Sequence, residues 1–137
     1  MANFIYKKAK QAMLSGQVNV IGSNLRVLLI DTNLYTANQN SDQYVSDIPI
    51  SAIKKRSGNL ANVSCNLGVL DADDLSIADH DGSSFNSIIV YQVGLSDSNS
   101  LLLFYIDSSY GLPFPGSAGI SPVAIIWDNG PNKIISL

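Results

Sequence analysis

The 137-residue sequence contains no glutamate, one histidine and one cysteine. A zinc site needs three or four Cys, His or acidic ligands at set spacings, and one Cys with one His do not supply them. A Ser-His-Asp triad would have to use His80, which stands between two aspartates in an expected turn. Cys65 cannot form an internal disulfide, and we expect it to be a small buried residue. These absences predict a protein that is not an enzyme and carries no cofactor and no metal.

Nucleotide-binding and membrane proteins also have signatures that this sequence lacks. The chain has no glycine-rich phosphate loop, and Gly116-Ser117-Ala118-Gly119 does not have the spacing of a nucleophile elbow. No apolar run approaches the length that crosses a bilayer, and no secretory leader opens the chain. We therefore expect a protein that folds in a reducing cytoplasm and has no membrane partner.

Charge is scarce and unevenly placed. Charged residues make up 14% of the chain, against about 25% in a typical soluble domain. Seven of the eight Lys and Arg residues lie in the first 56 positions, whereas eight of the eleven aspartates follow Ser57. A net charge of −3 makes general nucleic-acid binding a poor fit, because phosphate affinity needs clustered cations. Two local patches of opposite sign fit contact between protein subunits better, although sign can also drift along a short chain without consequence.

One helix is expected, at the N-terminus over about 2–15. Ile5, Ala9, Ala12 and Met13 share a face at helical spacing. Asn3 fits an N-cap, and a glycine at position 16 fits a helix stop. So short a helix is marginal alone in water and needs a surface to lie on, in its own subunit or in the next one.

The rest of the chain predicts short strands separated by turns. Aspartate, serine, asparagine and glycine favour turns and caps over helix interiors. Strands are expected at 25–30, 60–67, 75–77, 87–91, 101–106, 121–127 and 133–137, and an irregular segment at 33–59 with a helical turn near 41–46. Aromatic residues inside these runs should be core: Tyr91, Phe104, Tyr105 and Trp127. We expect a mainly β, single domain 1–137: an antiparallel β-sandwich or barrel of about six to seven strands over about 20–137, with the N-terminal α-helix.

The acidic stretch 71–84, DADDLSIADHDGSS, has two interpretations. Asp79-x-Asp81-Gly82 resembles the start of a calcium loop, but a calcium hand ends on a bidentate glutamate that this chain lacks. A looser calcium site between turns stays open. We favour the alternative, in which Asp71, Asp73 and Asp74 make turn bonds to the backbone and 79–82 forms a tight turn.

Several short motifs, taken together, resemble a known family. They are Ala2–Lys10, the following Ser-Gly, Leu25–Asp31 with Tyr35-Thr36, Ser46-Asp47-Ile48-Pro49, Asp71-Ala72-Asp73-Asp74, Tyr105-Ile106-Asp107, Gly111-Leu112-Pro113 and Trp127-Asp128-Asn129-Gly130. In this order, over essentially the whole chain, they look like a family of small virion structural proteins of tailed bacteriophages. The resemblance implies a capsid decoration, or cement, protein on the outer head surface, with a tail or neck component as the other location. The implied partners are the major capsid protein and copies of the chain itself, possibly as a trimer, in a virion assembled in the host cytoplasm.

Two segments are the candidate contacts for such a partner. In the N-terminal segment Phe4, Ile5 and Tyr6 would be apolar anchors, and Lys7, Lys8 and Lys10 could meet an acidic shell surface. The second candidate is Lys54-Lys55-Arg56. The competing interpretation is that the helix packs only on its own domain. A different function, a carbohydrate-binding module for a host surface, would use exposed tyrosines: Tyr35, Tyr44 and Tyr110.

Overall fold

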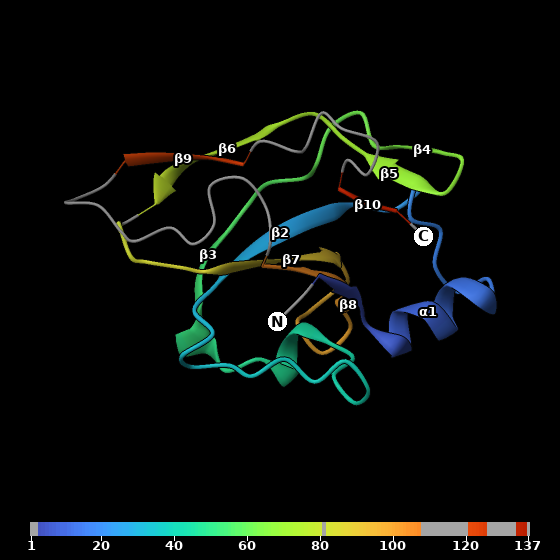
Figure 1. The fold of residues 1–137 in the computed structure, drawn as a ribbon, viewed down its shortest axis with the longest axis horizontal. Coiled ribbons are helices and arrows are strands. Elements are labelled where there is room, and N and C mark those ends of the chain that lie inside the picture. Colours follow the sequence, from blue (N-terminus) through green and yellow to red (C-terminus); the bar gives the residue numbers. More distant parts are fainter. Residues whose placement is uncertain (1–2, 81, 108–120, 126–133, 137) are drawn as a thin grey trace.

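The computed structural model describes residues 3–80, 82–107, 121–125 and 134–136. Strands dominate these residues, with one α-helix and two short 3₁₀ helices, η1 and η2 (Figure 1). In chain order the elements are β1 (Phe4–Ile5), α1 (Lys7–Leu14), β2 (Leu25–Ile30), η1 (Val45–Asp47), η2 (Ile50–Ala52), β3 (Ile53–Arg56), β4 (Ser64–Asn66), β5 (Val69–Asp71), β6 (Leu75–His80), β7 (Ser87–Gln92), β8 (Leu101–Ile106), β9 (Ser121–Ile125) and β10 (Ile135–Ser136).

A five-stranded antiparallel sheet in the order β1-β8-β7-β2-β3 is the centre of the fold. Its three middle strands are nearly continuous apolar runs: LRVLLI in β2, SIIVYQ in β7 and LLLFYI in β8. Successive side chains on a strand point to opposite faces of the sheet. Because consecutive residues such as Leu28 and Leu29 are both fully buried, both faces of this sheet are covered.

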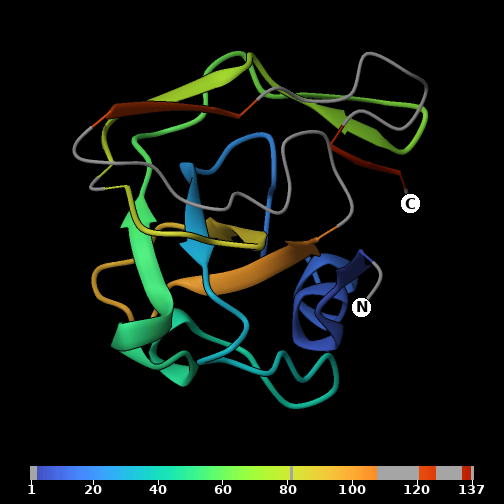
Figure 2. The same cartoon turned by 60° about the vertical axis from the view of Figure 1, so that its left-hand side comes forward.

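The covers on the two faces differ (Figures 1 and 2). Above the central sheet lie a three-stranded sheet, β10-β5-β4, and a two-stranded sheet, β6-β9. Below it lies the segment that joins β2 to β3, with η1 and η2. Backbone bonds hold this segment to β8: Val45 N–H donates to the Ser100 carbonyl at 2.9 Å, and Leu102 N–H donates to the Gln43 carbonyl at 2.9 Å.

The mainly β, antiparallel fold with a leading helix is confirmed. The described residues form ten strands, more than the six or seven expected, and the central sheet does not close into a barrel. Strands 25–30 and 101–106 have the expected bounds, and β7 and β8 form the expected hairpin. The expected core positions Tyr91, Phe104 and Tyr105 are buried, and Trp127 lies outside the described residues.

The helix begins later than expected. Phe4 and Ile5 form β1, which pairs with Phe104 and Tyr105 of β8, so these residues are strand and not helix. Asn3 therefore does not cap the helix. Its Oδ1 instead accepts a hydrogen bond from the Asp107 N–H at 2.9 Å.

The expected stop at Gly16 is confirmed. Gly16 has a positive φ of 76°, and its N–H donates to the Met13 carbonyl. The N–H of Gln17 donates to the Ala12 carbonyl at 2.9 Å, which completes a Schellman motif. Ala9 and Ala12 are buried, so α1 packs on its own domain beside β8.

Candidate protein-interaction surface

Strand β3 is one edge of the central sheet, because β2 is its only strand neighbour among the described residues. Its sequence is Ile-Lys-Lys-Arg, and it lies along the outer side of the sheet in Figure 2. Lys54 and Lys55 are half-buried and Arg56 is exposed. Charged residues on an edge strand discourage unwanted strand pairing, and they also give the edge a positive field that favours an acidic partner.

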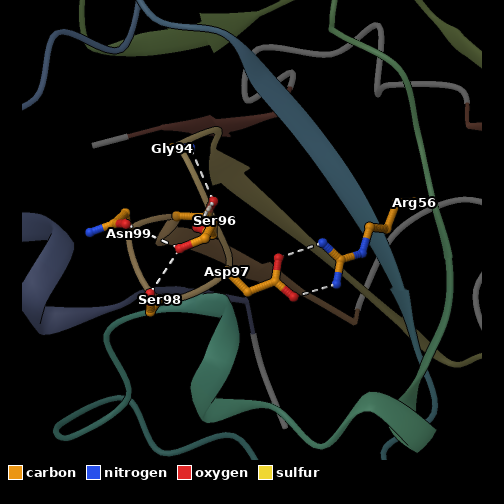
Figure 3. Close-up of polar contacts among 7 residues, drawn as sticks. Arg56, Gly94, Ser96, Asp97, Ser98 and Asn99 are labelled. Atoms are coloured by element: carbon orange, nitrogen blue, oxygen red, sulfur yellow. Dashed lines mark hydrogen bonds and ion pairs between the residues drawn. The ribbon is translucent and has the colours of Figure 1, made fainter.

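Arg56 forms an ion pair with the turn between β7 and β8 (Figure 3). Its Nη1 and Nη2 donate to Oδ1 and Oδ2 of Asp97 at 2.7 and 2.8 Å, a bidentate ion pair. The hydrogen bond from Arg56 lowers the pKa of Asp97, and the same bond raises the pKa of Arg56. Both side chains are more than a third exposed, so the pair positions the turn more than it stabilises the whole fold.

The turn 93–100 is fixed by its own polar groups (Figure 3). Ser100 Oγ accepts from the Gly94 N–H at 3.0 Å and donates to the Ser96 carbonyl at 2.9 Å. Ser96 Oγ lies 2.8 Å from Ser98 Oγ and donates to Asn99 Oδ1 at 3.1 Å. This ordered turn carries Leu95, whose side chain is completely exposed.

A second exposed apolar residue lies at the other end of β3. Ile50 begins η2, which leads directly into β3, and it is 82% exposed. Ile50 therefore lies just before β3, and Leu95 lies on the turn that Arg56, the last residue of β3, contacts through Asp97. We call Ile50, Lys54, Lys55, Arg56 and Leu95 the basic edge. Lys54, Lys55 and Arg56 were expected from the sequence. Ile50 and Leu95 were not, although a leucine within a Ser/Asp/Asn-rich turn is the signal that could have identified Leu95.

The N-terminal candidate is divided by the structure. Contrary to the expectation that they anchor a partner, Ile5 and Tyr6 are buried in the chain's own core, so their side chains are not on the surface. Phe4 is half-buried and stacks on Tyr105, with ring centroids 4.8 Å apart. The cations Lys7, Lys8 and Lys10 are exposed, as a contact would require.

Tyr6 belongs to a buried polar network. Its hydroxyl lies 3.0 Å from that of Tyr35, which donates to Asp42 Oδ2 at 2.6 Å. The same carboxylate oxygen accepts from the Asn38 N–H at 2.8 Å. Burial raises the pKa of both tyrosines. The network fastens the segment after β2 to the start of α1.

The tyrosines considered for carbohydrate do not form an exposed set. Tyr35 is buried, contrary to the expectation that it is exposed, and its hydroxyl donates a hydrogen bond to Asp42. Tyr44 is half-buried against the core. Tyr110 lies outside the described residues.

The acidic stretch is partly strand. Asp79 and His80 belong to β6, so the expected tight turn does not begin at Asp79. Asp73 Oδ2 accepts from Asn62 Nδ2 at 2.6 Å. Within the ranges that the structure describes, no group of three or more His, Cys or Asp side chains is placed to hold a metal ion.

Cys65 is exposed on β4, which corrects the expectation that it is buried. Of the expected strand 60–67, only Ser64–Asn66 forms a strand, because Asn62 and Leu67 have positive φ angles of 54° and 50°. Among the described residues β4 is an edge strand with all three residues exposed, so it has no buried face.

A scan against protein-family models finds no match, and a search of curated proteins finds no relative of this chain. In the described parts of the chain, no helix has the length and apolarity needed to cross a bilayer.

Proposed function

We propose that this protein is a non-enzymatic structural component of a tailed-phage virion, most simply a capsid decoration protein that binds the outer surface of the head through its basic edge. The observation that carries the proposal is the basic edge itself: a basic edge strand with an exposed apolar residue near each end. The sequence resemblance to small virion proteins supports the same function.

The basic edge offers three kinds of contact to a shell protein. The lysines of β3 favour an acidic surface and speed association, because complementary charge steers the encounter. Ile50 and Leu95 supply apolar area, and burying one such side chain contributes about 1.5–3 kcal/mol. The Arg56–Asp97 pair holds the turn in place before binding, which lowers the entropy cost of docking.

Modest contacts of this kind suit a protein that is displayed in many copies. Each copy buries a limited area, but the symmetry of the shell repeats the contact over the whole surface. The N-terminal lysines fit this function less well, because the neighbouring Ile5 and Tyr6 are core residues.

Charge reversal distinguishes the two candidate surfaces. Particles lacking the protein are incubated with the wild type, with Lys54→Glu/Lys55→Glu, or with the matched control Lys7→Glu/Lys8→Glu, which has the same net charge. The proposal predicts that occupancy falls severalfold for the β3 variant and stays near the wild-type level for the helix variant. Equal occupancy for all three proteins, or loss confined to the helix variant, contradicts it. Thermal unfolding of each protein checks that the fold is intact.

A tail or neck position is the alternative location. Imaging of labelled protein on the particle separates the two, because decoration of the head covers its whole surface whereas a tail or neck component gives a single focus. Binding at one focus would keep the structural role and reject head decoration.

A further inference from the structure

The hairpin of β4 and β5 has an unusual turn. Its two central residues, Leu67 and Gly68, both have positive φ angles, of 50° and 80°. Two-residue hairpin turns of this type usually carry Asn-Gly or Asp-Gly, and a bulky residue rarely adopts a positive φ. Leu67 is nevertheless there, and its side chain is 94% exposed.

The strand before this turn is an edge strand with no strand neighbour on its outer side among the residues that the structure describes. β4 is the outer strand of the β10-β5-β4 sheet, and Ser64, Cys65 and Asn66 are all exposed. Edge strands are usually blunted by lysine, proline or a bulge. The basic edge strand β3 follows this rule, whereas β4 contains no charge and no proline.

The register fixes which backbone groups point outward. Asn66 pairs with Val69 across the two-residue turn, and Cys65 pairs with Leu70. In such a hairpin the pair that flanks the turn exchanges hydrogen bonds, and the next pair does not. The N–H and carbonyl of Cys65 therefore point away from β5, toward the free edge.

We propose that β4 pairs antiparallel with β4 of a second copy of this chain, about a two-fold axis at Cys65. In this register Cys65 faces Cys65 of the second copy, and Ser64 faces its Asn66. Leu67 then faces Val63 of the second copy, and the same contacts recur across the axis, as isologous pairing requires.

A second copy suits this edge better than an acidic or basic partner does. The facing positions are uncharged, so two chains that each carry a net charge of −3 meet without like charges opposed in the strand. The exposed Leu67 meets a half-buried valine, and Ser64 meets an amide that can hydrogen-bond to it. The edge is thus complementary to itself in hydrogen bonding, in polarity and in the absence of charge.

Cross-linking tests the axis directly. The two Cys65 α-carbons would be about 5.5 Å apart in a hydrogen-bonded antiparallel pair, within the range that a disulfide spans. In a glutathione redox buffer, one glutathione disulfide is reduced to two thiols for each Cys65–Cys65 bond formed. The matched control is Cys65→Ser with Leu14→Cys, which places a lone thiol at a position that is 90% exposed on the far end of α1. We expect the wild type to form covalent dimer at least tenfold faster than the control, and equal rates would overturn the proposal.

Charge placement tests the register without a disulfide. In a Cys65→Ser background, Ser64→Lys/Asn66→Lys places lysines opposite each other across the axis, and Ser64→Lys/Asn66→Asp places lysine opposite aspartate. The first should raise the dimer dissociation constant by about tenfold and the second should lower it, since each facing pair occurs twice. Sedimentation velocity over a concentration series measures both.

A Cys65→Ser protein that stays monomeric at the highest concentrations reached would overturn the proposal, as would two variants that shift in the same direction. Because these experiments use the purified protein alone, their result is independent of whether the chain binds a phage head.

Discussion

The buried tyrosine network allows one prediction to be worked out in numbers. Tyr35→Phe removes a single hydroxyl from a side chain that is only 6% exposed. The ring still fills its place in the core, so the substitution changes hydrogen bonding and leaves packing nearly unchanged. Two interactions are lost: the 2.6 Å bond from Tyr35 to the Asp42 carboxylate and the 3.0 Å contact with the Tyr6 hydroxyl.

The loss of stability in Tyr35→Phe depends on whether Asp42 and the Tyr6 hydroxyl keep other hydrogen-bond partners. A hydrogen bond to a charged group contributes about 1.5–3 kcal/mol, and leaving a buried polar group without a partner costs about 1–3 kcal/mol. Asp42 keeps the bond from the Asn38 N–H, so the aspartate is not orphaned. The Tyr6 hydroxyl is fully buried and loses its partner. We expect Tyr35→Phe to lower the free energy of unfolding by about 3 kcal/mol, which corresponds to roughly 10 °C in melting temperature for a domain of this size.

Urea unfolding of four proteins tests this account: the wild type, Tyr35→Phe, the double variant Tyr6→Phe/Tyr35→Phe, and Tyr44→Phe at a half-buried tyrosine outside the network. The double variant should be no less stable than Tyr35→Phe, because it removes the hydroxyl that the single variant leaves without a partner. Tyr44→Phe should lie within about 0.5 kcal/mol of the wild type, as substitutions away from buried networks do. If Tyr35→Phe is as stable as Tyr44→Phe, the network does not fasten the segment after β2.

Three further predictions concern pH and the turn that Arg56 holds. Burial raises the pKa of Tyr6 and Tyr35 above the ordinary value of 10.0. Their contribution to the free energy of unfolding is therefore complete below pH 10 and falls above it by about 1.4 kcal/mol per pH unit for each tyrosine. Alkaline unfolding followed by tyrosinate absorbance will measure this loss. A double-mutant cycle on Arg56→Ala and Asp97→Ala should give a coupling energy of about 0.5 kcal/mol that becomes smaller in high salt. Because Arg56 lowers the pKa of Asp97, this coupling should be lost as the pH falls below the ordinary aspartate value of 3.8. Gly94→Ala should cost about 1–3 kcal/mol in thermal unfolding because a Cβ there would lie 2.6 Å from a backbone oxygen across the turn, whereas the control Gly58→Ala meets nothing within 4 Å and should be neutral.

The parts of the fold that could be predicted are those where the sequence pattern and the burial agree. β2, β7 and β8 are continuous apolar runs, and a strand covered on both faces requires that pattern. β3 was missed because Ile-Lys-Lys-Arg has no apolar period, since an edge strand buries little of itself. β1 was missed because Phe4 and Ile5 fit a helix face equally well, and only the partner strand β8 decides between the two.

The candidate surface was predictable only in its charged part. Clustered cations at 54–56 are visible in the sequence, but their place on a sheet edge depends on pairing with β2, in which Leu28 lies opposite Arg56, 28 residues later in the chain. The Ser/Asp/Asn-rich turn around Leu95 could have indicated that this leucine is exposed. Exposure of Ile50 depends on how the segment between β2 and β3 packs below the sheet, which local pattern does not encode. Cys65 was misjudged for the same reason, because alternation marks a strand without saying whether either face is covered.

The most direct test of the proposed function is the structure of an intact particle of the phage that carries this protein. We predict density for the chain over the outer surface of the head, with the edge formed by β3 against the shell. Absence of the chain from the purified particle, or its presence on the head with β3 turned to solvent, would contradict the account.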